Sequence, residues 1–287
     1  MPRLLADGHV SRDRRPGGDV LGGSVTYGTL TARRLGWEAA ILTAAGPDFE
    51  PEGELPGVAA FVRRSSATTR FVNEYDPDGT RHQIVTARAD DVDLEALPAA
   101  WRDPDALLLG PLVGELGGPF ATALEAGCVG AIAQGYVRAL DEEGRVSARE
   151  WPRPERDLLG VHVLFLSEQD LPQADDRARD LLAHVPMIAL TRGWRGLTLV
   201  TRQGCHDVPT LPRPEVDPTG AGDVFAAAFL VRYQETGDPL EAAAFGACAA
   251  SCAVEGIGTT TLGDRDEVLR RMARREHLIE TGEWEED

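Results

Sequence analysis

The chain contains no lysine, so arginine supplies all 29 of its basic residues. This absence excludes a Schiff-base lysine, the lysine of a Walker-A loop and the strand lysine of a protein kinase. Any phosphate chemistry must therefore use backbone N–H groups, arginine or a metal ion. The four cysteines include no CxxC pair, and Cys248 and Cys252 lie one helical turn apart in an alanine-rich segment. We interpret them as small core residues, which fits a reducing cytoplasm.

Long apolar runs and clusters of positive charge are also missing. No run approaches the ~20 apolar residues that a membrane helix needs. The opening "MPRLLADGHV" has no long apolar segment followed by a cleavage site, so we expect a cytoplasmic protein without a signal peptide. The net charge is −18, and no basic patch stands out. We therefore expect a small-molecule partner, and neither a nucleic acid nor a membrane.

What is present is an alternation of strand-like and helix-like segments, which predicts an α/β fold with a mostly parallel sheet. A short strand should end near Gly8, and a polar loop should follow it up to Gly23. A helix over 24–36, stopped by Gly36, should lead into a strand over 37–46. Further strands are expected at 105–112, 130–135, 161–167 and 187–193, further helices at 118–127 and 173–185, and a hairpin at 195–209.

Residues 61–87 follow a different pattern. Apolar and polar side chains alternate on both sides of "DPDG" at 76–79, which predicts an antiparallel hairpin. The hairpin is too short to bury a core of its own, so we expect a small β lid on a single domain that spans residues 1–287. The acidic tail after Arg275 is expected to fray.

A glycine-rich turn, "DPTGAGD" at 217–223, leads into the alanine-rich segment "VFAAAFLVRY". Its last residue, Asp223, should lie in the first turn of a helix, where free N–H groups and the helix dipole attract anions. The dipole should also keep the pKa of Asp223 low. A helix-start acid is common and needs no function. A plain helix start does not need two glycines, Thr219 and Asp217 around it, so the whole string favours a phosphate-binding turn.

This string resembles the second signature of the ribokinase-like carbohydrate kinases, the phosphofructokinase-B family. The start of the chain agrees, because "GHVSRD" places Asp13 five residues after Gly8. "GGSVTYGTLTARRLGWEAAILTAAGPD" is similar to the first signature of that family. The resemblance covers nearly the whole chain. It implies a three-layer α/β/α sandwich with a mostly parallel central sheet and a small β lid.

The resemblance also implies an activity, the transfer of the γ-phosphoryl group of ATP to a hydroxyl of a sugar or polyol. ATP with Mg²⁺ would lie across the strand ends. Asp223 would accept the proton of the attacking hydroxyl, and the amides of Gly220, Ala221 and Gly222 would stabilise charge on the transferring group. Phosphoryl transfer depends mainly on positioning and electrostatics, so the base need not be strong.

The acceptor site implied by the resemblance contains Asp13, Gly22, Gly23, Ser24 and Tyr27. On the residues alone, Ser24 could simply cap a helix and Tyr27 could be a core residue. Ribokinase-type chains carry asparagine where this chain has Tyr27, which argues against a ribose pocket. The sequence "GGSVTYG" is more similar to members of the family that act on cyclitols such as myo-inositol.

On the donor side, Asp170 of "SEQD" stands where many members carry a residue linked to Mg²⁺. Arg138 of "AQGYVR" could reach a phosphate or make a surface ion pair. A monovalent cation sits near the glycine turn in parts of the family, with Asp217 and Thr219 as its candidate neighbours here. The residues expected to contact the nucleotide are Thr191, Gly193, Gly196, Thr219 and Gly256.

Two alternatives stay open. A nucleoside kinase of the same family should need an aromatic surface for the base, for which Tyr27, Phe61 and Phe71 are the evident candidates. A non-catalytic sugar or nucleotide sensor could keep the fold, although the intact Asp223 argues against it. The chain could be a monomer or a homodimer. A dinucleotide-binding oxidoreductase is weaker, because its glycine fingerprint should follow the first strand.

Overall fold

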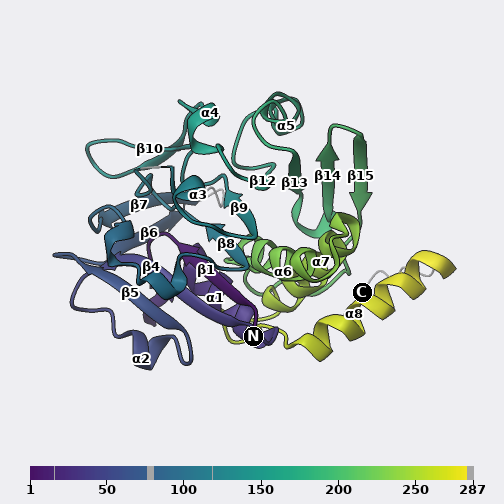
Figure 1. The fold of residues 1–287 in the computed structure, drawn as a ribbon, viewed down its shortest axis with the longest axis horizontal. Coiled ribbons are helices and arrows are strands. Elements are labelled where there is room, and N and C mark those ends of the chain that lie inside the picture. The colour runs from purple at the N-terminus through teal and green to yellow at the C-terminus, as the bar shows by residue number, and fades with distance from the viewer. Residues whose placement is uncertain (16, 76–80, 118, 283–287) are drawn as a thin grey trace.

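A nine-stranded sheet forms the centre of the computed structural model, which describes residues 1–15, 17–75, 81–117 and 119–282. Its strand order is β15-β14-β13-β12-β9-β8-β1-β4-β5 (Figure 1). The strands are β1 (Arg3–Asp7), β4 (Glu38–Ala45), β5 (Ala59–Arg64), β8 (Ala106–Leu109), β9 (Cys128–Ile132), β12 (Val163–Ser167), β13 (Met187–Thr191), β14 (Leu197–Thr201) and β15 (Gly204–Val208). All pairs from β13 to β5 are parallel, and β14 and β15 add an antiparallel edge.

Helices cover both faces of this sheet. One face packs against α1 (Ser24–Arg34), α6 (Ala221–Thr236), α7 (Pro239–Ala253) and α8 (Arg265–Thr281), and the other against α3 (Phe120–Ala123) and α5 (Ala174–Leu181). Successive residues of β1 alternate between the two cores, with Leu4 in the first and Leu5 in the second, as the pleat of a strand requires. The predicted three-layer α/β/α sandwich with a mostly parallel sheet is confirmed. The short helices are α2 (Pro51–Glu54), α4 (Pro154–Asp157), η1 (Leu94–Ala96), η2 (Ala99–Trp101) and η3 (Gly193–Arg195).

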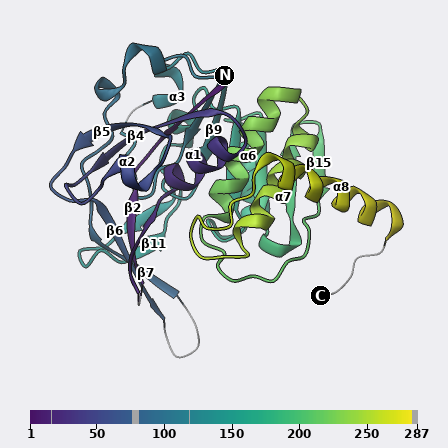
Figure 2. The ribbon, with the colours of Figure 1, turned by 90° about the horizontal axis from the view of Figure 1, so that it is seen from below.

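A second, four-stranded sheet has the order β3-β2-β6-β7, and we call it the small sheet. Its strands are β2 (Ser11–Arg15), β3 (Gly18–Gly22), β6 (Thr69–Tyr75) and β7 (Arg81–Ala87). Figure 2 shows β2, β6 and β7 together at one side of the main sheet. A separate antiparallel pair joins β10 (Arg138–Leu140) to β11 (Val146–Ala148).

The small sheet corrects two predictions. The polar stretch before Gly23 is not a loop but the hairpin of β2 and β3, whose side chains are polar because they form ion pairs rather than a core, as Arg12 does with Glu54. The stretch predicted as one hairpin over 61–87 contributes to two sheets. Ala59–Arg64 pairs with β4 in the main sheet, and only β6 and β7 form the antiparallel pair. The predicted turn at 76–79 lies outside the described residues.

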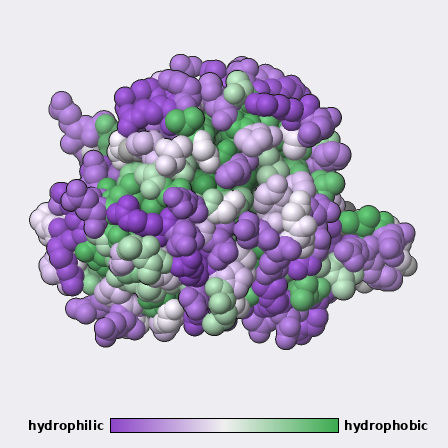
Figure 3. All heavy atoms as spheres, in the orientation of Figure 1, coloured by the Kyte–Doolittle hydropathy of each residue, from purple (hydrophilic) through white to green (hydrophobic). Residues whose placement is uncertain are grey.

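Helix lengths differ from the prediction in two places. The helix expected over 118–127 is only the single turn Phe120–Ala123. The tail expected to fray after Arg275 is helical to Thr281, because Asp264 caps α8 through the N–H of Glu267 and Leu278 packs against the core. Side chains of hydrophilic residues cover much of the face seen in Figure 3, with smaller hydrophobic groups between them. Within the described part of the chain, every helix is too short or too polar to span a bilayer.

Asp7, at the end of β1, is a fully buried acid that the sequence did not single out. Neither of its carboxyl oxygens has a hydrogen-bond partner among the described residues. It faces the core that contains Leu5, and burial raises its pKa well above the ordinary value. The folded protein therefore holds a neutral carboxyl at a pH where the unfolded chain has already released the proton.

This difference makes stability depend on pH. Above the ordinary pKa of aspartate, folding must keep or recapture the proton, so the contribution of Asp7 to stability decreases as pH rises toward its folded-state pKa. We expect Asp7→Asn, which cannot ionise, to gain about 1–3 kcal/mol relative to wild type between pH 5 and pH 8. Chemical denaturation across this range measures the change. Asp176→Asn, at an exposed acid, is the control, and a difference between Asp7→Asn and wild type that stays constant with pH would contradict the expectation.

Candidate active site

The carboxyl ends of the parallel strands face the amino end of α6 and the small sheet. The neighbours of Asp223, in the first turn of α6, come from four separate parts of the chain. They are Asp13 in β2, Ser24 at the start of α1, Arg138 after β9 and Asp170 after β12. Ligands of open parallel sheets bind at this edge, because the strand-to-helix connections there leave backbone groups and side chains exposed. We take this cluster as the candidate active site.

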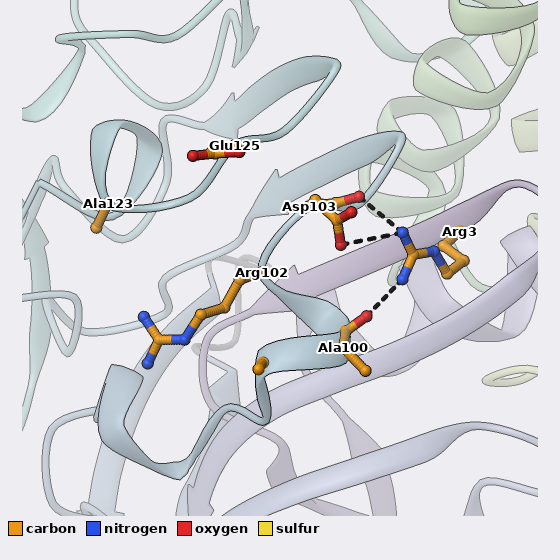
Figure 4. A pocket seen from close by; sticks show the side chains of 7 residues that line it. Arg3, Ala100, Arg102, Asp103, Ala123 and Glu125 are labelled. Atoms are coloured by element: carbon orange, nitrogen blue, oxygen red, sulfur yellow. Dashed lines mark hydrogen bonds and ion pairs between the residues drawn. The ribbon is translucent and has the colours of Figure 1, made fainter.

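A cavity of about 690 Å³ lies at the opposite edge, beside the amino ends of β1 and β8 (Figure 4). Arg3 reaches across its wall and donates hydrogen bonds to the backbone oxygens of Ala100 and Asp103. The lining residues are Arg3, Ala99, Ala100, Arg102, Asp103, Ala123 and Glu125. The sequence predicts no site residue among them, and their own contacts are structural.

Asp223 keeps part of its surface in contact with solvent, although protein closely surrounds its carboxyl group. Desolvation raises its pKa to about 6, and the negative charges of Asp170 and Asp13 add to the rise. The nearby hydroxyl of Ser24 and the charge of Arg138 act in the opposite direction. The expectation that the helix dipole would keep this pKa low is therefore wrong, because burial outweighs the dipole. A carboxylate with a pKa near 6 is suited to accept a proton at neutral pH.

Gly220 sets the shape of the turn before α6. It has φ of 82°, the left-handed conformation that favours glycine. The ring of Tyr27, from α1, covers its bare side so closely that a Cβ atom there would lie 2.3 Å from Cε1. Tyr27 is only 2% exposed. The ring face of Tyr27 therefore contacts the glycine turn. The resemblance implied that Tyr27 lies in the acceptor site, but in the structure its ring is buried against Gly220.

The amides of the turn are not equivalent. The N–H of Ala221 donates to the backbone oxygen of Pro218 at 3.2 Å. Within residues 119–282, no acceptor is found for the N–H groups of Gly220 and Gly222. The first N–H groups of a helix have no partner inside it, and they form a favourable site for an anion. Gly220 and Gly222 are therefore better placed than Ala221 to bind a phosphoryl oxygen.

Predicted acceptor residues lie near Asp223, among them Asp13, Ser24 and Tyr27. Asp13 accepts a hydrogen bond from the hydroxyl of Ser11 at 2.9 Å. Gly22 passes so close that a Cβ atom would lie 2.6 Å from Oδ2 of Asp13. Gly23 is the N-cap residue of α1, and Ser24 after it is buried beside Asp223. A hydroxyl compound held between Asp13 and Asp223 would find donors and acceptors on both sides.

Arg138 contacts the small sheet, and its charge acts on both Asp170 and Asp223. Its guanidinium donates to Oε1 of Gln83 in β7 at 3.0 Å and to the backbone oxygen of Leu112 at 3.3 Å, and it lies over the ring of Phe71. Burial raises the pKa of Asp170, and the backbone N–H of Ser167 and the charge of Arg138 partly offset this rise. Arg138 is thus part of the site rather than a surface arginine.

The predicted nucleotide residues are less concentrated. Thr191 ends β13, pairs in register with Ser167 and donates to the backbone oxygen of Leu166 at 3.4 Å. Gly196 packs against the backbone of Val208, and Gly256 packs against Thr261. Thr219 lies in the turn itself, where its N–H donates to Asp217. Gly193 begins the η3 turn after β13.

Glu115 and His9 form a buried polar pair that sequence reasoning missed. Glu115 accepts hydrogen bonds from the N–H groups of His9, Leu112 and Val113, each at 2.8 Å. The ring of His9 lies 2.8 Å from the hydroxyl of Thr69. These contacts hold the segments after β1 and β8 against the small sheet. An isolated glutamate in "LVGEL" carries no sequence signal for such a role.

The site suits the two ions that the sequence suggested to different degrees. Among the described residues, no three histidine, cysteine, aspartate or glutamate side chains group as metal ligands. Asp170 and Asp223 are two carboxylates of one site, which suits Mg²⁺ held by one or two protein oxygens together with donor phosphates. Asp217 does not suit a free monovalent cation. Its Oδ1 accepts from Thr219, and its Oδ2 lies 2.8 Å from Nη2 of Arg15.

Comparison with known proteins gives a match to one family over part of the chain. Residues 157–265, which include the glycine turn and Asp223, match the model of the pfkB family of carbohydrate kinases. A nucleoside kinase of Methanocaldococcus jannaschii is 31% identical over 120 residues, which are 40% of this chain and 40% of the relative. The similar region thus spans less than half of that relative, so the similarity does not assign the activity of the relative to this chain.

Solved structures extend the likeness to the whole fold. A pyrophosphate-dependent kinase of the ribokinase family, complexed with a pyrophosphate analogue and myo-inositol, has a TM-score of 0.76 at 23% identity. The likeness covers 93% of this chain and 99% of that one. A fructokinase of Xylella fastidiosa with bound ATP also has a TM-score of 0.76, at 17% identity, covering 96% and 99% of the two chains.

Proposed function

Since the chain has the ribokinase-like fold and matches the pfkB family of carbohydrate kinases over residues 157–265, we propose that it is a kinase that phosphorylates a hydroxyl group of a sugar or cyclitol. The observation that carries the proposal is the position of Asp223. Its carboxyl group, with a pKa raised to about 6 by burial, lies in the helix turn that also contains the N–H groups of Gly220 and Gly222, for which the described residues provide no acceptor. A general base and an anion site are thus combined in one turn.

The proposed mechanism uses these groups in turn. Asp13 and Asp223 hold the acceptor hydroxyl, and Asp223 accepts its proton as the oxygen attacks the terminal phosphoryl group, while the anhydride bond of the donor breaks and releases ADP or phosphate. The amides of Gly220 and Gly222 bind the charge that develops on the transferring oxygens, and Arg138 adds positive charge near Asp223. Mg²⁺ held by Asp170 with the donor phosphates would neutralise part of their charge.

The acceptor class is proposed from the shape of the site. A nucleoside base would need an open aromatic surface, and the three candidate rings do not offer one. Tyr27 is covered by Gly220, Phe71 is 4% exposed, and Phe61 packs against Trp101 with ring centroids 6.1 Å apart. We therefore favour a sugar or cyclitol over a nucleoside, in spite of the nucleoside kinase among the relatives.

The donor is proposed to be ATP, as the sequence suggested, with pyrophosphate as the second candidate. The likeness to the pyrophosphate-dependent kinase favours the second, and the likeness to the ATP-bound fructokinase favours the first. Both donors present the same chemistry to the turn, because a phosphoryl group is transferred from a phosphoanhydride. They differ in whether the protein must also bind an adenosine moiety.

The test is to incubate the protein with Mg²⁺ and either ATP or pyrophosphate, against a panel of sugars, cyclitols including myo-inositol, and nucleosides. We expect a phosphorylated sugar or cyclitol, identified by mass spectrometry, with one donor strongly preferred. Phosphorylation of nucleosides alone would replace the acceptor class. Binding of a sugar in calorimetry without turnover by either donor would support a non-catalytic sensor and overturn the kinase proposal.

A further inference from the structure

Asp217 is a nearly buried carboxylate at the start of the glycine turn (residues 217–223). It is 8% exposed, and its own N–H and that of Val216 both donate to the backbone oxygen of Val254. Its Oδ1 accepts from the N–H of Thr219 at 3.0 Å, which closes the turn before Gly220. A buried carboxylate with only this bond would be costly, because an uncompensated charge inside a protein loses its hydration.

The compensating charge comes from the opposite end of the chain. Nη2 of Arg15, the last residue of β2, lies 2.8 Å from Oδ2 of Asp217. Arg15 lies two residues after Asp13 on the same strand, so both side chains leave the same face of the small sheet. Arg14 between them points away and is 65% exposed. One strand therefore carries the predicted acceptor ligand and the partner of the catalytic turn.

The geometry gives Asp217 a positive partner. With Nη2 of Arg15 at 2.8 Å from Oδ2, a guanidinium already lies beside the carboxylate. A free cation at the same oxygen would have to displace a guanidinium that the strand holds in place.

We propose that Arg15 is a built-in cation of the glycine turn, which neutralises Asp217 in place of the monovalent ion that the sequence suggested, and which binds the small sheet to the turn. The inference rests on the proposed function for its kinetic consequence, although the ion pair itself does not depend on it. Because a tethered guanidinium replaces a diffusible ion, the protein should not need potassium.

The test removes the guanidinium and supplies potassium instead. Wild type is expected to show the same rate in potassium chloride and in tetramethylammonium chloride of equal ionic strength. Arg15→Gln should lose roughly tenfold or more in kcat, and potassium but not tetramethylammonium should restore part of it. Arg14→Gln, the neighbour on the opposite face of the strand, is the matched control and should behave as wild type. Adding Asp217→Asn to Arg15→Gln should abolish the response to potassium.

A second readout needs no turnover. The melting temperature of Arg15→Gln should rise when potassium replaces tetramethylammonium, whereas that of wild type should not. Potassium activation of the wild type, or an Arg15→Gln variant indistinguishable from Arg14→Gln in rate and melting, would overturn the proposal. If no acceptor is phosphorylated at all, the proposed function fails, and the melting comparison still decides the role of Arg15.

Discussion

Asp223→Asn is expected to lower kcat at least about 100-fold, the lower range of general-base effects, while the protein stays folded. Asparagine keeps the size of the side chain but cannot accept the proton of the acceptor hydroxyl. The wild-type rate should also fall as pH decreases below about 6, because protonation then removes the base. Steady-state kinetics of both proteins from pH 5 to pH 8 measure these effects.

The matched control for this variant is Asp266→Asn. Asp266 also lies in the first turn of a helix, α8, but is exposed and remote from the site. If Asp223 only interacted with the helix dipole, both variants would lose a few tenths of a kcal/mol in stability and neither would lose activity.

The raised pKa of Asp223 also predicts how stability depends on pH. Folding keeps Asp223 protonated between the ordinary pKa and about 6, so wild-type stability declines with rising pH there, and Asp223→Asn should be at least as stable at pH 8.

Gly220→Ala is the second change with a large expected effect. The new Cβ would lie 2.3 Å from the ring of Tyr27, and alanine is strained at φ of 82°. The buried ring of Tyr27 has no room to move, so the turn must shift. The N–H groups of Gly220 and Gly222 then no longer point toward the phosphoryl group. We expect a loss of about 100- to 1000-fold in kcat, as when an oxyanion-hole donor is removed.

The Gly237→Ala variant separates the effect of backbone strain from the effect of displacing the amides of the glycine turn. Gly237 caps the other end of α6 with φ of 70°, and a Cβ atom there meets nothing within 4 Å. It should cost roughly 1–2 kcal/mol in stability with normal activity. Gly220→Ala should cost a further ~1–3 kcal/mol by overpacking. Denaturation curves and kinetics of both variants, at a temperature where both are folded, make the comparison. Wild-type kcat in Gly220→Ala would show that the shape of the turn is not needed.

Local patterns predicted the elements whose chemistry is local. An aspartate followed by proline is typical of a helix start, and α7 begins at such a pair, where the Asp238 carboxylate accepts from the N–H groups of Leu240 and Glu241. The parallel strands were recognisable as apolar runs because both of their faces are buried. Where pairing with distant strands determines whether a segment is a strand, the prediction from sequence was wrong. The polar sequence "SRDRR" has no strand signal, yet it is β2, because β3 and β6 satisfy its backbone and acidic side chains bind its arginines.

The sequence by itself determined the resemblance to the ribokinase-like kinases, most of the parallel strands of the main sheet, and the place of Asp223 in a glycine turn at a helix start. These follow from short-range patterns, which the residues carry wherever the chain folds. Only the tertiary structure decided that the Asp223 pKa rises rather than falls, that Tyr27 supports Gly220 instead of facing the acceptor, and that Arg15 neutralises Asp217. Each of these depends on groups far apart in the chain, whose burial and pairing arise only when the sheets and helices have come together.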